Sequence, residues 1–114
     1  MDRNQLSDAH RKWFSDVLLP QGADATSVLQ KLQEELDELV IAHFSIDLQA
    51  DDPERLAIAR AAHAQEVADI GICLTIYAGL MGVDEPAEQE KKLKINRART
   101  WVRPPGSDVF RHEQ

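Results

Sequence analysis

The sequence has little cysteine, few aromatic residues and no long apolar run. Its single cysteine, Cys73, excludes an intramolecular disulfide and suits a reducing compartment. The longest uncharged stretch, Ile70 to Val83, has 14 residues and three glycines, which is short for a membrane span. The first five residues are polar, so we expect no secretory signal peptide. The single cysteine, the lack of a long apolar run and the polar N-terminal segment together predict a soluble, cytoplasmic protein without a membrane partner.

Positive charge is also scarce, and it is unevenly distributed. The net charge of −7 argues against a general nucleic-acid binder, because nucleic acids are themselves polyanions. Only Lys31, Arg55 and Arg60 lie between residues 13 and 90, whereas seven of the 13 Lys and Arg residues fall within 91–111. This basic segment would suit a small anionic ligand.

No alternating apolar pattern predicts a strand, and no internal repeat is present. Apolar spacing and capping residues instead predict an all-α fold with helices over residues 5–18, 27–48, 53–80 and 85–99. Asp52 and Pro53 are typical of a helix start, and Asp24, Thr26 or Ser27 can cap the second helix. We expect a single domain over residues 1–114, in which 101–114 form an irregular C-terminal tail.

Two acidic clusters lie on the second and third predicted helices. Glu34, Glu35 and Glu38 share one side of the second helix. Glu35 and Glu38 lie at the border of an apolar stripe that we expect to pack inward, with Glu34 beside them; the stripe consists of Leu29, Leu32, Leu36, Leu39 and Val40. Glu66 lies in the middle of the apolar stripe of the third helix, and Asp69 follows one turn later. An uncompensated carboxylate in such a stripe costs several kcal/mol or more, and cations are few nearby. A divalent metal ion is the simplest compensation.

The spacing of the acids indicates which metal and which chemistry. Glu35 with Glu38, and Glu66 with Asp69, are i, i+3 pairs on consecutive helices that a short connection makes antiparallel neighbours. An all-oxygen cage of this kind favours Mg²⁺ or Mn²⁺ over zinc. Because Mg²⁺ shares its coordination with substrate phosphates, the cage and the basic segment together suggest phosphoryl or nucleotidyl chemistry.

Two other interpretations compete with this one. A ferritin-like di-iron bundle also uses glutamates from several helices, but it needs Glu-x-x-His pairs, which neither acidic cluster has. A non-enzymatic helical interaction module would carry the acids only as a solvated face. Calorimetry separates the module from an enzyme, because the module predicts no saturable uptake of Mg²⁺ or Mn²⁺.

The combined motifs resemble a known family. Glu34-Glu35-x-x-Glu38, a 27-residue gap, Glu66-x-x-Asp69 and then Lys92-x-x-x-Asn96-Arg97 resemble the signature of the MazG-like all-α nucleoside triphosphate pyrophosphohydrolases, over about residues 27–100. The segment from Asn96 to Trp101 further resembles small phage and prophage members described as dATP/dGTP pyrophosphohydrolases, including those of phages that replace adenine by 2-aminoadenine. The resemblance implies a four-helix bundle assembled as a homodimer or tetramer, in the host cytoplasm if phage-encoded.

The resemblance also implies an activity and the residues that perform it. Family members convert a nucleoside triphosphate, here most readily dGTP or dATP, to the monophosphate and pyrophosphate by attack of water on the α phosphorus. Such an enzyme would serve in control of the phage or cellular nucleotide pool, and the alternative within the superfamily is a dUTP/dCTP or house-cleaning pyrophosphohydrolase.

The implied ligands of two or three Mg²⁺ or Mn²⁺ ions are Glu35, Glu38, Glu66 and Asp69, with Glu34 at a further metal or orienting the water. Glu34 and Glu38 are the catalytic candidates, and the implied phosphate-binding residues are Lys92, Asn96, Arg97 and Arg99.

Base recognition has two aromatic candidates. The indole of Trp13 or of Trp101 could stack on a purine, because a flat aromatic ring stabilises a stacked base by about 1–3 kcal/mol. Neither ring distinguishes guanine from adenine, and a core position is the alternative for Trp13.

Overall fold

The computed structural model describes residues 1–113, so Gln114 at the end of the predicted tail lies outside the described residues. The chain forms two compact units, Met1–Val83 and a second one from Asp84 onward, and each is described by itself. The first unit contains α1 (Arg3–Trp13), a π-helical turn (Phe14–Leu18), a 3₁₀ turn (Leu19–Gln21), α2 (Ala25–Leu48) and α3 (Pro53–Leu80). The second contains α4 (Glu85–Ala98) and two short strands, β1 (Trp101–Val102) and β2 (Arg111–His112). The helices confirm the all-α class, and the single-domain expectation stays a prediction.

An aspartate caps the start of every α-helix in the described chain. The Asp24 side chain accepts a hydrogen bond from the backbone N–H of Ser27, and the Ser27 hydroxyl accepts one from the Asp24 N–H, which closes a capping box. Asp52 caps α3 in front of Pro53, whose missing N–H is harmless in the first turn. The predicted bounds of the third helix, 53–80, are therefore confirmed, and Asp24 is the cap among the three candidates for α2.

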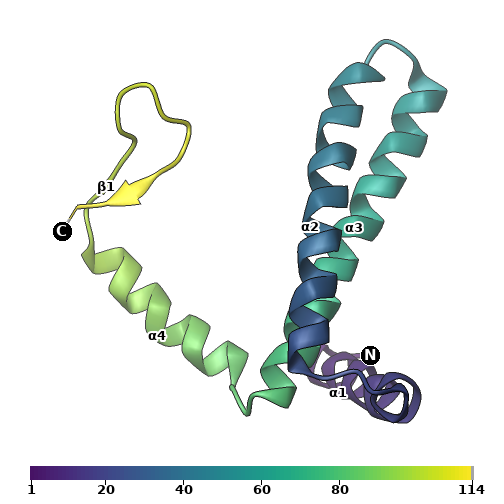
Figure 1. The fold of residues 1–114 in the computed structure, drawn as a ribbon. Helices are drawn as coiled ribbons and strands as arrows, with labels where there is room; N and C mark the ends of the chain where they lie inside the picture. Colours follow the sequence, from purple (N-terminus) through teal and green to yellow (C-terminus); the bar gives the residue numbers. More distant parts are fainter. Residues whose placement is uncertain (114) are drawn as a thin grey trace. The chain divides into compact units, whose positions relative to one another are not determined.

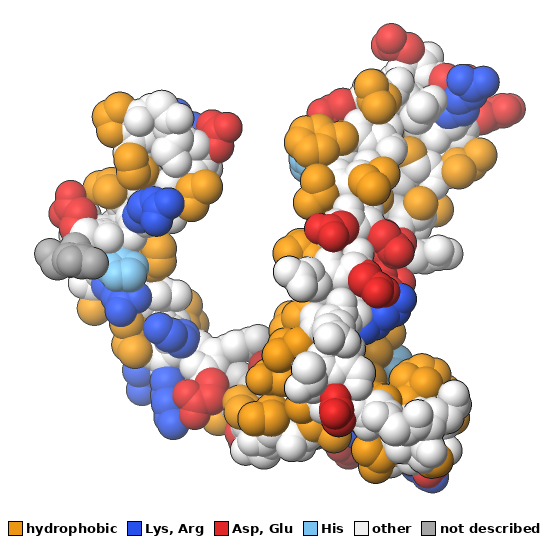
Figure 2. Space-filling model, in the orientation of Figure 1, with side chains coloured by type: hydrophobic (Ala, Val, Ile, Leu, Met, Phe, Trp, Pro, Cys, Tyr) orange, Lys and Arg blue, Asp and Glu red, His pale blue; other side chains and the backbone are white. Residues whose placement is uncertain are grey.

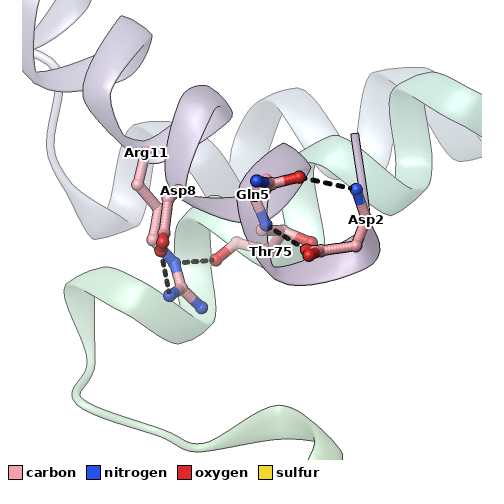
Figure 3. A network of polar contacts seen from close by, with 5 residues as sticks. All are labelled: Asp2, Gln5, Asp8, Arg11 and Thr75. Carbon is pink, nitrogen blue, oxygen red and sulfur yellow. Dashed lines mark hydrogen bonds and ion pairs between the residues drawn. The ribbon is translucent and has the colours of Figure 1, made fainter.

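In the first unit, α2 and α3 lie side by side as a long antiparallel hairpin, and α1 packs near one end of it (Figure 1). Phe14 of the π-helical turn, Val28 of α2 and Ile76 of α3 form the buried core at that end. Arg11 of α1 reaches α3, where its Nε donates to the backbone oxygen of Thr75 at 3.5 Å (Figure 3). The core therefore fixes α1 against the start of α2 and the end of α3.

The buried face of α2 differs from the predicted one. Val28, Glu35 and Ala42, which are seven residues apart, are its buried residues. Leu29, Leu36 and Val40 belong to the stripe that we expected to pack inward, but they are 44%, 51% and 48% exposed. The expectation was wrong because α2 has more apolar side chains than its neighbours within one copy of the chain can cover. Glu35 consequently lies on the buried face of α2, between Val28 and Ala42, and not at its border.

In the second unit, the tail after α4 is not irregular throughout. β1 and β2 pair antiparallel, with Trp101 opposite His112. The indole Nε1 of Trp101 donates to the backbone oxygen of Asn96 at 2.9 Å, which ties the strand pair to the end of α4. Among residues 1–113 no single helix is long and apolar enough to cross a membrane, and only α3 and α4 counted together, across the break between them, reach that length and composition.

Candidate metal centre

Three carboxylates meet between α2 and α3. Glu35 and Glu38 of α2 and Glu66 of α3 each offer one oxygen, and these oxygens lie within 4.8 Å of one another. Glu35 is only 5% exposed, Glu66 is half-buried and Glu38 faces solvent. In the space-filling view, acidic side chains gather midway along the α2–α3 hairpin, with hydrophobic side chains on either side of them (Figure 2). We call Glu35, Glu38 and Glu66 the acidic cluster.

Two oxygens of the acidic cluster are buried without a hydrogen-bond partner. They are Oε2 of Glu35 and Oε2 of Glu66. The other oxygen of Glu35, Oε1, pairs with the Lys31 ammonium at 3.1 Å. Buried polar groups are nearly always paired, so two orphaned carboxylate oxygens at one place need a partner. A hard divalent cation fits them, because it prefers carboxylate oxygen and offsets several negative charges at once.

The mutual proximity of the carboxylates changes their proton affinities. As long as both carboxylates are charged, neither can donate to the other; a proton on Glu66 would allow a hydrogen bond to Glu35, and this, together with burial and the negative charge of Glu38, raises the pKa of Glu66 to about 7. Burial alone would raise the pKa of Glu35, but hydrogen bonds from Lys31 and from Glu66 outweigh it and lower the pKa. Opposite shifts of this kind are typical of functional sites, where charge is concentrated for a ligand.

The other two predicted acidic ligands lie beside the cluster. Asp69 is exposed on α3 and lines the cavity next to Glu35, outside the group of three. Glu34 is also exposed, and its Oε2 lies 3.3 Å from the ammonium of Lys31. The structure thus brings Glu35, Glu38 and Glu66 together, and the metal-ligand roles of Glu34 and Asp69 stay predictions.

A cavity of about 430 Å³ lies beside the acidic cluster, within the first unit. At one end Glu35, Asp69 and Lys31 supply its charged groups. The remaining wall is mainly apolar and includes Phe14 and Ile76 from the core, together with Trp13. An apolar cavity with a few charged groups at one end is typical of a small-molecule site. Trp13, which is 48% exposed, is therefore placed on the wall of a cavity that contacts the acidic cluster.

The predicted phosphate-binding residues and the second tryptophan belong to the second unit. Lys92, Asn96 and Arg97 are exposed on α4, and Arg99 is half-buried at its C-terminal cap. The ring of Trp101 meets that of His112 edge to face, with centroids 5.6 Å apart. Their contacts with a nucleotide stay predictions.

Lys31 lines the site, but no functional role was predicted for it from the sequence. It is the only Lys or Arg among residues 1–113 that lines the cavity. Its spacing to Glu34 and Glu35, i, i+3 and i, i+4, is a signal that the sequence contains, because residues at these spacings meet on one helix face. The scarcity of cations elsewhere in this region makes the pairing more informative.

The fold and the site together define an all-α protein with a carboxylate metal centre beside a small-molecule cavity. A solved structure, the cyanophage S-2L MazG-like pyrophosphohydrolase bound to dGDP and three catalytic Mn²⁺ ions per active site, is similar to this chain over 97% of it and 96% of that chain, with 29% identity and a TM-score of 0.67. No protein-family model and no curated protein matches the chain. The structural match confirms the resemblance drawn from the motifs: over nearly its whole length the chain is similar to a MazG-like pyrophosphohydrolase, which supports its being an enzyme of the nucleoside triphosphate pyrophosphohydrolase class.

Proposed function

We propose that this enzyme converts a purine deoxynucleoside triphosphate, dGTP or dATP, to the monophosphate and pyrophosphate. The observation that carries the proposal is the pair of orphaned carboxylate oxygens, on Glu35 and Glu66, beside an apolar cavity that Trp13 lines. The similar cyanophage enzyme, which has dGDP and Mn²⁺ bound, supports the same class of ligand here. A nucleoside fits the apolar wall, and its phosphates fit the charged end.

The acidic cluster would hold the metal ions, two or three Mg²⁺ or Mn²⁺. Glu35, Glu38 and Glu66 form the shared centre, because their oxygens already lie within 4.8 Å of one another. Asp69 and Glu34 complete the ligand set from the adjacent surface. When bound, such ions polarise phosphate oxygens and lower the pKa of the attacking water.

The protein's own groups would position the substrate for attack on the α phosphorus. Trp13 would stack on the base from the wall of the cavity that Glu35 also lines. Glu34 and Glu38 face solvent, so each can accept a hydrogen bond from the attacking water and take its proton. A leaving pyrophosphate gains negative charge, which is best offset by cations. The cations proposed for that role are Lys92, Arg97 and Arg99, and Asn96 is proposed as a neutral hydrogen-bond donor to the phosphates.

We also propose that the enzyme works as a homodimer or tetramer. Leu36, Val40 and Phe44 on α2 and Ile58 on α3 are between 48% and 70% exposed in a single copy. Large apolar side chains gathered on two adjacent helices are typical of a surface that another subunit covers. Sedimentation equilibrium tests this, because a monomer at micromolar concentration would contradict it.

The experiment for the proposed activity is a screen of all common nucleoside triphosphates with Mn²⁺ and separation of the products. We expect dGTP and dATP to give monophosphate and pyrophosphate, and no product with EDTA. Release of phosphate would contradict the bond assignment. Preference for dUTP or dCTP would contradict the purine assignment and favour the alternative branch of the superfamily.

A further inference from the structure

Lys31 holds a position that connects the acidic cluster with the cavity. Its ammonium lies 3.1 Å from Oε1 of Glu35 and 3.3 Å from Oε2 of Glu34, so it neutralises part of the acidic charge in the structure. The side chain is nevertheless 57% exposed, and it lines the cavity. A lysine in this setting is held by charge and not by packing, because four flexible methylenes carry its ammonium.

Binding of a metal ion to Glu35 changes the situation of Lys31. A dication and an ammonium compete for the same carboxylate, and like charges at such short range repel. The ammonium then loses its partner on Glu35, while the side chain still lines the cavity. Phosphate groups that lie between the base and the acidic cluster would then offer the ammonium a second anion beside Glu34, and lysine binds phosphate well as a mobile point charge.

We propose that Lys31 is a positioning residue that exchanges partners during the catalytic cycle. In the metal-free protein it pairs with Glu35 and Glu34 and competes with the first metal ion; once metal is bound, it pairs with a phosphate of the nucleotide. This inference rests on the proposed function, because it requires metal at the acidic cluster and a nucleotide in the cavity. It adds a group on α2 that contacts the phosphates from the first unit.

The test uses Lys31→Met, which keeps the length and removes the charge, and Lys31→Arg, which keeps the charge. Lys12→Met is the matched control, because Lys12 also pairs with a carboxylate one turn away, Asp16 at 2.6 Å, but does not line the cavity. Isothermal titration measures Mn²⁺ affinity without nucleotide and then dGDP affinity at saturating Mn²⁺. The Mn²⁺ affinity and the dGDP affinity together separate a partner exchange from a structural role, because a partner exchange changes them in opposite directions.

For Lys31→Met we expect Mn²⁺ to bind about threefold more tightly, since a competing ion pair of modest strength is lost. We expect dGDP to bind about tenfold more weakly, since a charge-assisted contact is lost. Lys31→Arg should retain dGDP affinity within about threefold, and Lys12→Met should change neither reading. Affinities that both fall, or that both stay unchanged, would overturn the partner exchange while leaving the proposed function intact. Absence of Mn²⁺ binding by the wild type would instead overturn the proposed function, and this inference with it.

Discussion

Replacing Glu66 with glutamine separates the two effects that this carboxylate has on the protein. Glutamine preserves the size of the side chain and removes its charge. Without metal, the charge of Glu66 is unfavourable beside Glu35 and Glu38, which raises its pKa to about 7. With metal, the same charge becomes a ligand. We therefore expect Glu66→Gln to be more stable than the wild type in EDTA, and to gain less from Mn²⁺.

The pH dependence follows from the direction of this shift. Because the folded-state pKa of Glu66 exceeds its ordinary value of 4.5, the folded protein retains a proton that the unfolded chain releases. The wild type should therefore lose stability in EDTA as pH rises from about 4.5 through about 7. Glu66→Gln should lack this loss, so the difference between the two melting temperatures should widen across that range and be constant above it.

The effect of metal can be estimated from linkage. Loss of even an outer-shell partner typically costs 10–100-fold in metal affinity, so loss of a ligand should cost about 100-fold. At an Mn²⁺ concentration 100 times its Kd, the wild type should melt about 10–20 °C higher than in EDTA, whereas Glu66→Gln should gain only about 2–3 °C. Thermal denaturation from pH 5 to 9, with and without Mn²⁺, measures both effects. Glu90→Gln, an exposed glutamate on α4, is the control. Equal Mn²⁺ shifts in Glu66→Gln and the wild type would refute the acidic cluster as a metal site.

Three further predictions concern the core, the α1–α3 contact and the cavity. Phe14→Ala removes a ring that is 3% exposed and packs in the core with Val28 of α2 and Ile76 of α3, and urea denaturation should show a loss of about 3–5 kcal/mol in the free energy of unfolding. A Cβ at Gly79 would lie 2.7 Å from Nε of Arg11, so Gly79→Ala should stabilise the protein, by up to about 1 kcal/mol, only when it is combined with Arg11→Ala. Urea denaturation that shows the same effect of Gly79→Ala in the wild type and in Arg11→Ala would contradict the contact. Trp13→Ala should raise KM for dGTP about tenfold with little change in kcat, because stacking on the base stabilises ground and transition states alike, and steady-state kinetics that show an unchanged KM would exclude stacking.

The helices were predictable because their signals are local. Asp52 and Pro53 mark the start of α3 within two adjacent residues, and the predicted bounds 53–80 match the structure. The position of Glu66 on an apolar stripe was also readable, since it depends only on helical periodicity. Both signals survive folding because nothing in the tertiary structure opposes them.

The orientation of α2 was not predictable in the same way. Its apolar residues cover more than one face, and periodicity does not say which face meets α3 and which meets another surface. In the structure Val28, Glu35 and Ala42 are buried, and Leu36 is half exposed. The strand pair at Trp101 and His112 was missed because two-residue strands are too short for an alternating pattern. The place of Asp69 beside the acidic cluster, outside its group of three, depends on side-chain geometry that spacing alone does not define.

The most direct test of the central claim is hydrolysis of dGTP in ¹⁸O-labelled water with Mn²⁺, followed by mass spectrometry of both products. Attack on the α phosphorus places the label in dGMP and leaves pyrophosphate unlabelled. Glu66→Gln should form both products much more slowly than the wild type. Label in pyrophosphate, or full activity in Glu66→Gln, would contradict water attack on the α phosphorus beside the acidic cluster.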